Sequence, residues 1–87
     1  MYLDIGFDFS VREECVLGVF DLDNTTWSKR TRAFLARAEA DGQVVEATDG
    51  LPKSFLLTSE YGQTRVYLTK YNAPVLQKRL LNSKESV

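Results

Sequence analysis

The sequence predicts a small α+β domain with one main helix packed on a largely antiparallel sheet. A chain of 87 residues makes one domain. Its composition, 44 % hydrophobic and 26 % charged, is that of an ordinary folded globular protein. Strand-like segments follow the main helical segment in direct succession and do not alternate with helices, which favours the α+β class over a parallel α/β sheet. The predicted order of elements is β-β-α-β-β-β-α.

The N-terminal segments have strand patterns. "MYLDIG" (1–6) alternates apolar and polar residues and ends at a glycine, as a short strand does. "FDFSVREE" (7–14) also alternates, and it either extends this strand or turns back from it. "CVLGVFDL" (15–22) is a continuous apolar run of strand length, which predicts a buried strand.

The central segment is predicted to be a helix over residues 29–40, after a polar loop, "DNTTWS", in which Thr26 or Ser28 caps the helix. Asp41-Gly42 ends the helix, with the glycine where a left-handed residue is favoured. Helical spacing assigns the buried face to Trp27, Thr31, Phe34, Leu35 and Ala38.

The C-terminal half changes period. "QVVEAT" (43–48) is predicted to be a strand, and "SFLLTS" (54–59) and "RVYLTK" (65–70) form a hairpin around a turn at "EYGQ". "DGLPKS" (49–54) has the composition of a turn.

"NAPVLQKRLL" (72–81) reads as a short helix, with Asn72 as its cap and Pro74 in its first turn. The domain is therefore expected to cover residues 1–82, followed by a frayed polar tail over 83–87.

One motif suggests catalysis. "VFDLDNTT" (19–26) is similar to the opening of haloacid-dehalogenase-type phosphatases, in which Asp21 would be the nucleophile and Asp23 the acid and base. Such an enzyme needs further βα units, a lysine and a later acidic pair, and 87 residues leave no room for them. A strand that runs into a polar turn explains the motif better, so no catalytic residue is predicted and the phosphatase is the least favoured hypothesis.

Other chemistries are restricted by residue types. The chain has no histidine and a single cysteine, Cys15, which excludes histidine-based metal sites and Cys-His or Ser-His pairs. No metal and no cofactor is predicted. No apolar run approaches the roughly 20 residues that span a bilayer, and the N-terminal residues do not read as an apolar signal segment. We therefore expect a cytoplasmic protein without membrane contact.

Three segments carry a resemblance to a known family: "LDIGFDF", "GVFDLDNTTWSKRTRAFLARAE" and "DGLPKSFLLT". Through them, residues 2–82 resemble the Rem family of bacterial extracellular-matrix regulators, closest to the RemB type. RemA-type members are DNA-binding transcription regulators of matrix and biofilm genes that form closed rings and hold DNA through basic residues. The resemblance implies a regulator of the same output that assembles into a homo-oligomeric ring. Such assembly would also cover the edges of a small sheet.

The chain departs from the RemA type at the residues implicated in DNA contact. Cys15, Leu51 and Pro52 stand where RemA-type relatives carry arginine. The net charge of −1 shows no overall basic excess. A DNA surface would therefore depend on other cations of the helix and the following turn. These candidates are Lys29, Arg30, Arg32, Arg37 and Lys53.

Two hypotheses stay open. In the first, the ring binds double-stranded DNA through these candidates. In the second, the ring is a protein-interaction module of the same pathway, with unknown protein partners, that binds no DNA. The cations of the helix would then form a solvated flank, with Arg37 paired to Asp41 four residues on.

Overall fold

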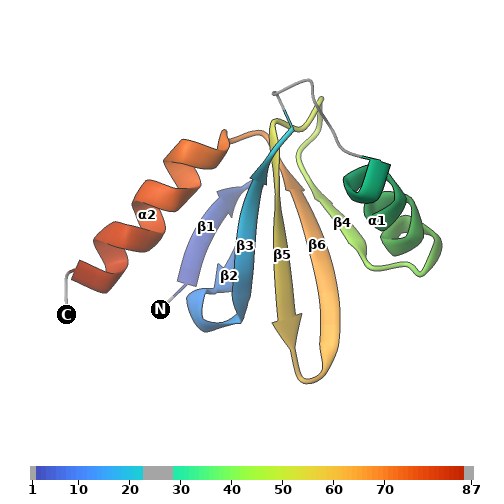
Figure 1. The fold of residues 1–87 in the computed structure, drawn as a ribbon. Coiled ribbons are helices and arrows are strands. Elements are labelled where there is room, and N and C mark those ends of the chain that lie inside the picture. Colours follow the sequence, from blue (N-terminus) through green and yellow to red (C-terminus); the bar gives the residue numbers. More distant parts are fainter. Residues whose placement is uncertain (1, 23–28, 86–87) are drawn as a thin grey trace.

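The computed structural model describes residues 2–22 and 29–85, with side chains up to residue 81. Two sheets are flanked by two helices (Figure 1). The elements are β1 (Tyr2–Gly6), β2 (Phe9–Arg12), the 3-10 turn η1 (Glu13–Cys15), β3 (Val16–Asp21), α1 (Lys29–Ala40), β4 (Val44–Ala47), β5 (Ser54–Glu60), β6 (Gln63–Thr69) and α2 (Ala73–Glu85). The α+β class is confirmed, with one strand more than the predicted order, because Phe9–Arg12 forms a strand of its own.

The β1–β2 hairpin explains that additional strand. The chain reverses at Phe7 and Asp8, which have φ of 53° and 63°, directly after Gly6 at φ 91°. The Asp4 carboxylate accepts a hydrogen bond of 2.9 Å from the Gly6 N–H and supports this reversal. The segment 7–14 therefore turns back from the first strand and does not extend it.

The larger sheet has the strand order β3-β5-β6-β4 and is antiparallel except for the β4–β6 pair. The predicted β5–β6 hairpin is confirmed, with Tyr61 and Gly62 at φ of 52° and 76° in its turn. The strand predicted over residues 15–22 is confirmed as β3, but the prediction that it is buried was wrong. β3 is an edge strand, and a register shift between Val16 and Gly18 leaves Leu17 64 % exposed.

One face of this sheet packs against β1, β2 and α2. Its core consists of Leu3, Ile5, Val11, Ala47, Leu56 and Leu76. Asn72 caps α2 as predicted, accepting a hydrogen bond of 3.0 Å from the Val75 N–H. α2 continues to Glu85, three residues into the segment expected to be a frayed tail, and is longer than the predicted short helix.

α1 covers the opposite face through Ala38, with Phe55 and Val66 below it. The helix has its predicted bounds, and Gly42 (φ 72°) ends it, while the Gln43 N–H donates to the Ala38 carbonyl over 2.9 Å. Phe34 was expected on the buried face but is 38 % exposed, at the margin between the helix and the edge of the sheet. The predicted cap and Trp27 lie outside the described residues.

Candidate nucleic-acid interface

Four of the five predicted DNA-contacting residues lie on α1, and all four are exposed. Arg30 and Arg37, seven residues apart, lie on one line along the helix, next to its buried stripe. Lys29 and Arg32, three residues apart, are neighbours on the solvent side. Within the described part of the chain, none of these four cations has an ion pair.

The helix carries its cations at the end that is already positive. The first turn of α1 contains no acidic residue, whereas Lys29, Arg30 and Arg32 lie within its first four positions. Aligned peptide dipoles place roughly half a positive charge at a helix N-terminus, so these side chains raise the free energy of the isolated helix. A bound anion would relieve this repulsion, which makes this end of α1 the most favourable place for phosphate among the candidates.

Lys53 lies at the same end of the molecule. Its backbone N–H donates to Thr69 over 2.8 Å, and its carbonyl accepts from the Leu22 N–H over 2.8 Å. These bonds hold the exposed Lys53 directly before β5 and beside the end of β3. Figure 1 shows that β3 ends and β5 begins at the end of the sheet nearer the start of α1. The structure thus places Lys53 with Lys29, Arg30 and Arg32 at one end, while Arg37 lies two turns further along the helix.

The ion pair proposed for a purely solvated flank is absent. Among the described side chains, Arg37 and Asp41 do not come within ion-pair distance, and only their backbones are bonded, over 2.9 Å from the Asp41 N–H to the Arg37 carbonyl. Arg37 therefore keeps its full charge available to solvent or to a ligand.

Two of the positions at which the RemA-type proteins of the resemblance carry arginine lie far apart in this structure. Leu51, 91 % exposed, precedes β5, whereas Cys15 lies beside Glu60 at the other end of that strand. Burial raises the pKa of the Cys15 thiol, and the Glu60 carboxylate raises it further. This end of the molecule thus offers acidic groups and a neutral thiol.

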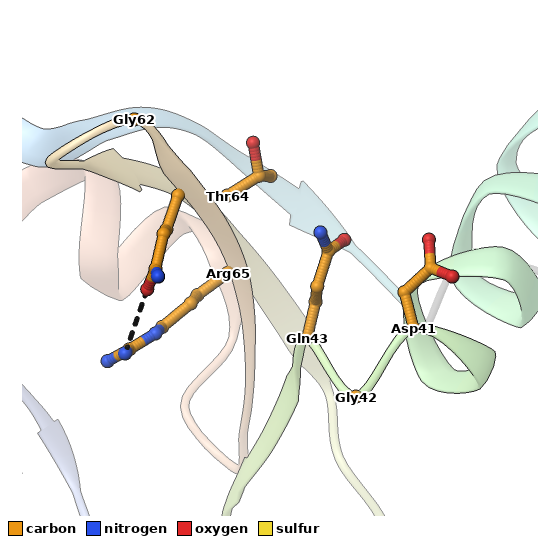
Figure 2. A pocket seen from close by; sticks show the side chains of 7 residues that line it. Asp41, Gly42, Gln43, Gly62, Thr64 and Arg65 are labelled. Carbon is orange, nitrogen blue, oxygen red and sulfur yellow. Dashed lines mark hydrogen bonds between the residues drawn. The ribbon is translucent and has the colours of Figure 1, made fainter.

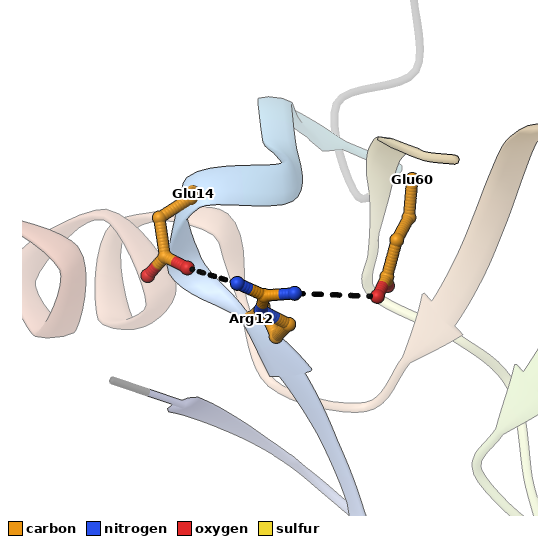
Figure 3. A network of polar contacts seen from close by, with 3 residues as sticks. All are labelled: Arg12, Glu14 and Glu60. Atoms are coloured by element: carbon orange, nitrogen blue, oxygen red, sulfur yellow. Dashed lines mark hydrogen bonds and ion pairs between the residues drawn. The ribbon is translucent and has the colours of Figure 1, made fainter. Parts of the chain in front are cut away.

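The cation at that end is already paired. Arg12 lies between two carboxylates, with Nη2 3.2 Å from Glu14 and Nη1 3.8 Å from Glu60 (Figure 3). The hydrogen bond with Glu14 raises the pKa of the Arg12 guanidinium. Because two acidic groups offset its charge, Arg12 adds little to a phosphate-binding surface, and the basic candidates at the other end stand apart from this acidic region.

A polar hollow beside the β5–β6 hairpin carries both signs of charge. It has a volume of about 400 Å³ between the α1–β4 connection and the β5–β6 hairpin, and its lining includes Asp41, Gln43 and Arg65 (Figure 2). Arg65 donates a hydrogen bond of 3.4 Å to Gln63 within this lining. No nucleophilic thiol and no base paired with a hydroxyl lines it, so its geometry supports solvation of the hairpin and no particular reaction.

Only part of the phosphatase-like motif lies among the described residues. Asp21 is exposed at the end of β3, opposite Ser54 of β5, and Asp23 lies outside the described residues. Across residues 2–22 and 29–81, no group of three acidic, cysteine or histidine side chains is placed to hold a metal ion. Within the described helices, none is long and apolar enough to cross a membrane.

Comparison with known proteins adds no assignment: the chain matches no protein-family model and no curated protein.

Proposed function

We propose that this protein is a regulator of bacterial extracellular-matrix and biofilm gene expression that assembles into a ring and binds double-stranded DNA. The observation that carries the proposal is the group of cations at the N-terminal end of α1, which have no ion pair within the described chain and lie at the same end as Lys53. The resemblance to the Rem family supports the regulatory role, and a bacterial cytoplasmic location follows from it.

Separation of charge reconciles this proposal with a net charge of −1. Glu14 and Glu60 lie beside Arg12 at the other end of the molecule, away from the cations of α1, whereas Asp21 lies at the end of β3 near Lys53. Each phosphate that is neutralised releases condensed counterions, and a ring repeats the same few contacts around its circumference. A modest number of cations per subunit can then give strong binding at low salt.

Fluorescence anisotropy with a labelled A·T-rich duplex, measured from low to physiological salt, tests the proposal. We expect affinity to fall steeply as salt rises, and Lys29→Glu, Arg32→Glu and Lys53→Glu each to weaken binding and flatten the salt slope by about one to two phosphate contacts. Lys78→Glu makes the same charge change on α2 and is the matched control, expected to bind like the wild type.

A protein that is shown to be assembled but does not bind DNA even at low salt would overturn the DNA proposal. The second candidate function, a protein-interaction ring of the same pathway, would then remain. One observation favours it: Leu51 is 91 % exposed at a position where RemA-type relatives carry arginine, which suits an apolar contact better than a phosphate. A wild type without DNA affinity, together with a Leu51→Asp variant that stays assembled but loses regulatory output, would support that candidate.

A further inference from the structure

An open apolar groove lies between α1 and the exposed edge of the larger sheet. It has a volume of about 210 Å³ and is separate from the polar hollow beside the β5–β6 hairpin. Its lining combines aromatic and aliphatic side chains with one arginine. The residues are Phe20, Arg30, Thr31, Phe34, Phe55 and Leu57.

The floor of the groove is built from stacked rings. Phe20 and Phe55 lie 4.9 Å apart between centroids, with an angle of 17° between their planes. The Phe20 ring also covers Gly18, where an added Cβ would be 2.9 Å from it. Phe20 remains 45 % exposed, so the subunit leaves an ordered aromatic surface in contact with water, at a cost in hydration free energy.

The tip of the β1–β2 hairpin carries an aromatic residue and an acidic residue, which match the apolar lining and the arginine of the groove. Phe7 and Asp8 both adopt left-handed backbone conformations, which cost free energy in residues other than glycine, and Phe7 is 53 % exposed. Within the described residues, the Asp8 carboxylate has no ion pair. A strained turn thus holds an aromatic ring and a free carboxylate side by side at its tip.

We infer that the Phe7–Asp8 tip of one subunit inserts into the apolar groove of a second copy, with Phe7 between Phe20 and Phe34 and Asp8 beside Arg30. The size is suitable, since an apolar cavity of about 150 Å³ accommodates benzene, and this open groove has about 210 Å³. The charges are suitable as well, because Arg30 lines the groove and has no ion pair within the described chain.

The two features cannot meet within one subunit. The β1–β2 hairpin packs on the face of the larger sheet that carries Leu56, whereas the groove opens on the face that carries Phe55. Contact between different surfaces of successive copies is heterologous, and it closes into a ring when the rotation between subunits allows it. The inference rests on the ring assembly of the proposed function and names the surfaces that form it.

Sedimentation velocity without DNA tests the inference. Wild-type protein should associate as its concentration rises, and Phe7→Ala should weaken association by about 30-fold or more, because truncation of a buried aromatic anchor has an effect of that size. Tyr61→Ala is the matched control. Tyr61 is also an exposed aromatic residue with positive φ at a hairpin tip, and it should leave association unchanged.

A mixing experiment distinguishes head-to-tail contact from a symmetric one. Phe7→Ala keeps an intact groove, and Phe34→Ala keeps an intact tip, so each variant alone should be monomeric and their mixture should form a one-to-one dimer and nothing larger. In case Phe34→Ala fails to fold, a charge exchange repeats the test: Asp8→Arg and Arg30→Asp should each weaken association, and together in one chain they should restore it.

Wild-type protein that stays monomeric at all concentrations, a Phe7→Ala variant that associates like the wild type, or a mixture that fails to form the dimer would each overturn the inference. These results are read without DNA, so they are separate from the anisotropy titration. A ring that assembles but does not bind DNA contradicts the DNA-binding proposal alone, whereas a Phe7→Ala variant that associates like the wild type contradicts this inference alone.

Discussion

Thr69 donates a hydrogen bond of 2.7 Å from its hydroxyl to the carbonyl of Ile5, and both residues are fully buried. The bond joins β6 of the larger sheet to β1 of the hairpin, across 64 positions of sequence. The same hydroxyl accepts a hydrogen bond of 3.2 Å from the Tyr71 N–H. One side chain thus satisfies two backbone groups at the junction of both sheets and the approach to α2.

Thr69→Val is expected to lower the free energy of unfolding by about 1–3 kcal/mol, because it leaves a buried carbonyl and an N–H without their partner at almost unchanged volume. Urea denaturation measures the change. Thr64→Val, on the same strand but without a hydrogen bond of its side chain in the described structure, is the control and should have little effect. Equal stability of both variants would show that the Thr69 bridge is unimportant.

Gly6→Ala should destabilise the fold by about 1–3 kcal/mol, since Gly6 has φ of 91° and an added Cβ would lie 3.0 Å from the Tyr71 ring. Gly50→Ala is the comparison: nothing lies within 4 Å of its added Cβ, and its φ is not positive. Thermal unfolding should therefore show a loss for the first variant and no loss for the second. The reverse order would contradict the hairpin geometry described above.

Arg32→Glu should stabilise the fold by about 0.5–1 kcal/mol, because it places a favourable charge at the positive end of α1. Under the proposed function it should also weaken DNA binding, because it removes a proposed phosphate contact. Arg37 lies in the last turn, where a cation is favourable, so Arg37→Glu should destabilise the fold instead. Urea denaturation at low salt measures both. Loss of stability in Arg32→Glu would show that helix electrostatics do not oppose the basic end.

The Cys15 thiol should resist alkylation at neutral pH in the folded protein. Burial and the Glu60 carboxylate raise its pKa above the usual 9.0, so the folded state favours the protonated thiol. Protonation of the thiol therefore stabilises the folded state fully below about pH 9. This stabilisation is lost as the pH rises through the folded-state pKa.

Rates of reaction with iodoacetamide as a function of pH measure this shift. Glu60→Gln should move the rate profile to lower pH, whereas Glu46→Gln, on β4 at the other edge of the sheet, should leave it unchanged. A native thiol that reacts as fast as the thiol of the unfolded chain at neutral pH would contradict the raised pKa.

The elements that the sequence predicted correctly are those with local capping and turn signals. Gly42 predicted the C-terminal end of α1, and Asn72 and Pro74 predicted the start of α2, because capping involves residues within one turn of each other. Tyr61-Gly62 between two apolar strands predicted the second hairpin for the same reason. These elements follow from contacts of short sequence separation, and the structure confirms them.

The turn of the β1–β2 hairpin could not be predicted from such local signals. Phe7 and Asp8 form its tip without a glycine at either position, in conformations that most sequence signals disfavour, so the turn could not be distinguished from a continuous strand. The apolar run of residues 15–22 suggested a buried strand because both faces are hydrophobic. Strand order is set by pairing with distant residues, and it placed this run at an edge.

The sequence by itself determined the α+β class, the C-terminal end of α1 and the hairpin at Tyr61-Gly62, since each depends on residue type and on neighbours close along the chain. Only the tertiary structure decided that Lys53 lies at the same end as the start of α1, that Arg12 is paired with two carboxylates, and that Phe20 and Phe34 border an open groove. These relationships join segments that are distant in the chain. They arise from sheet register and helix packing, which depend on the free energy of the whole core.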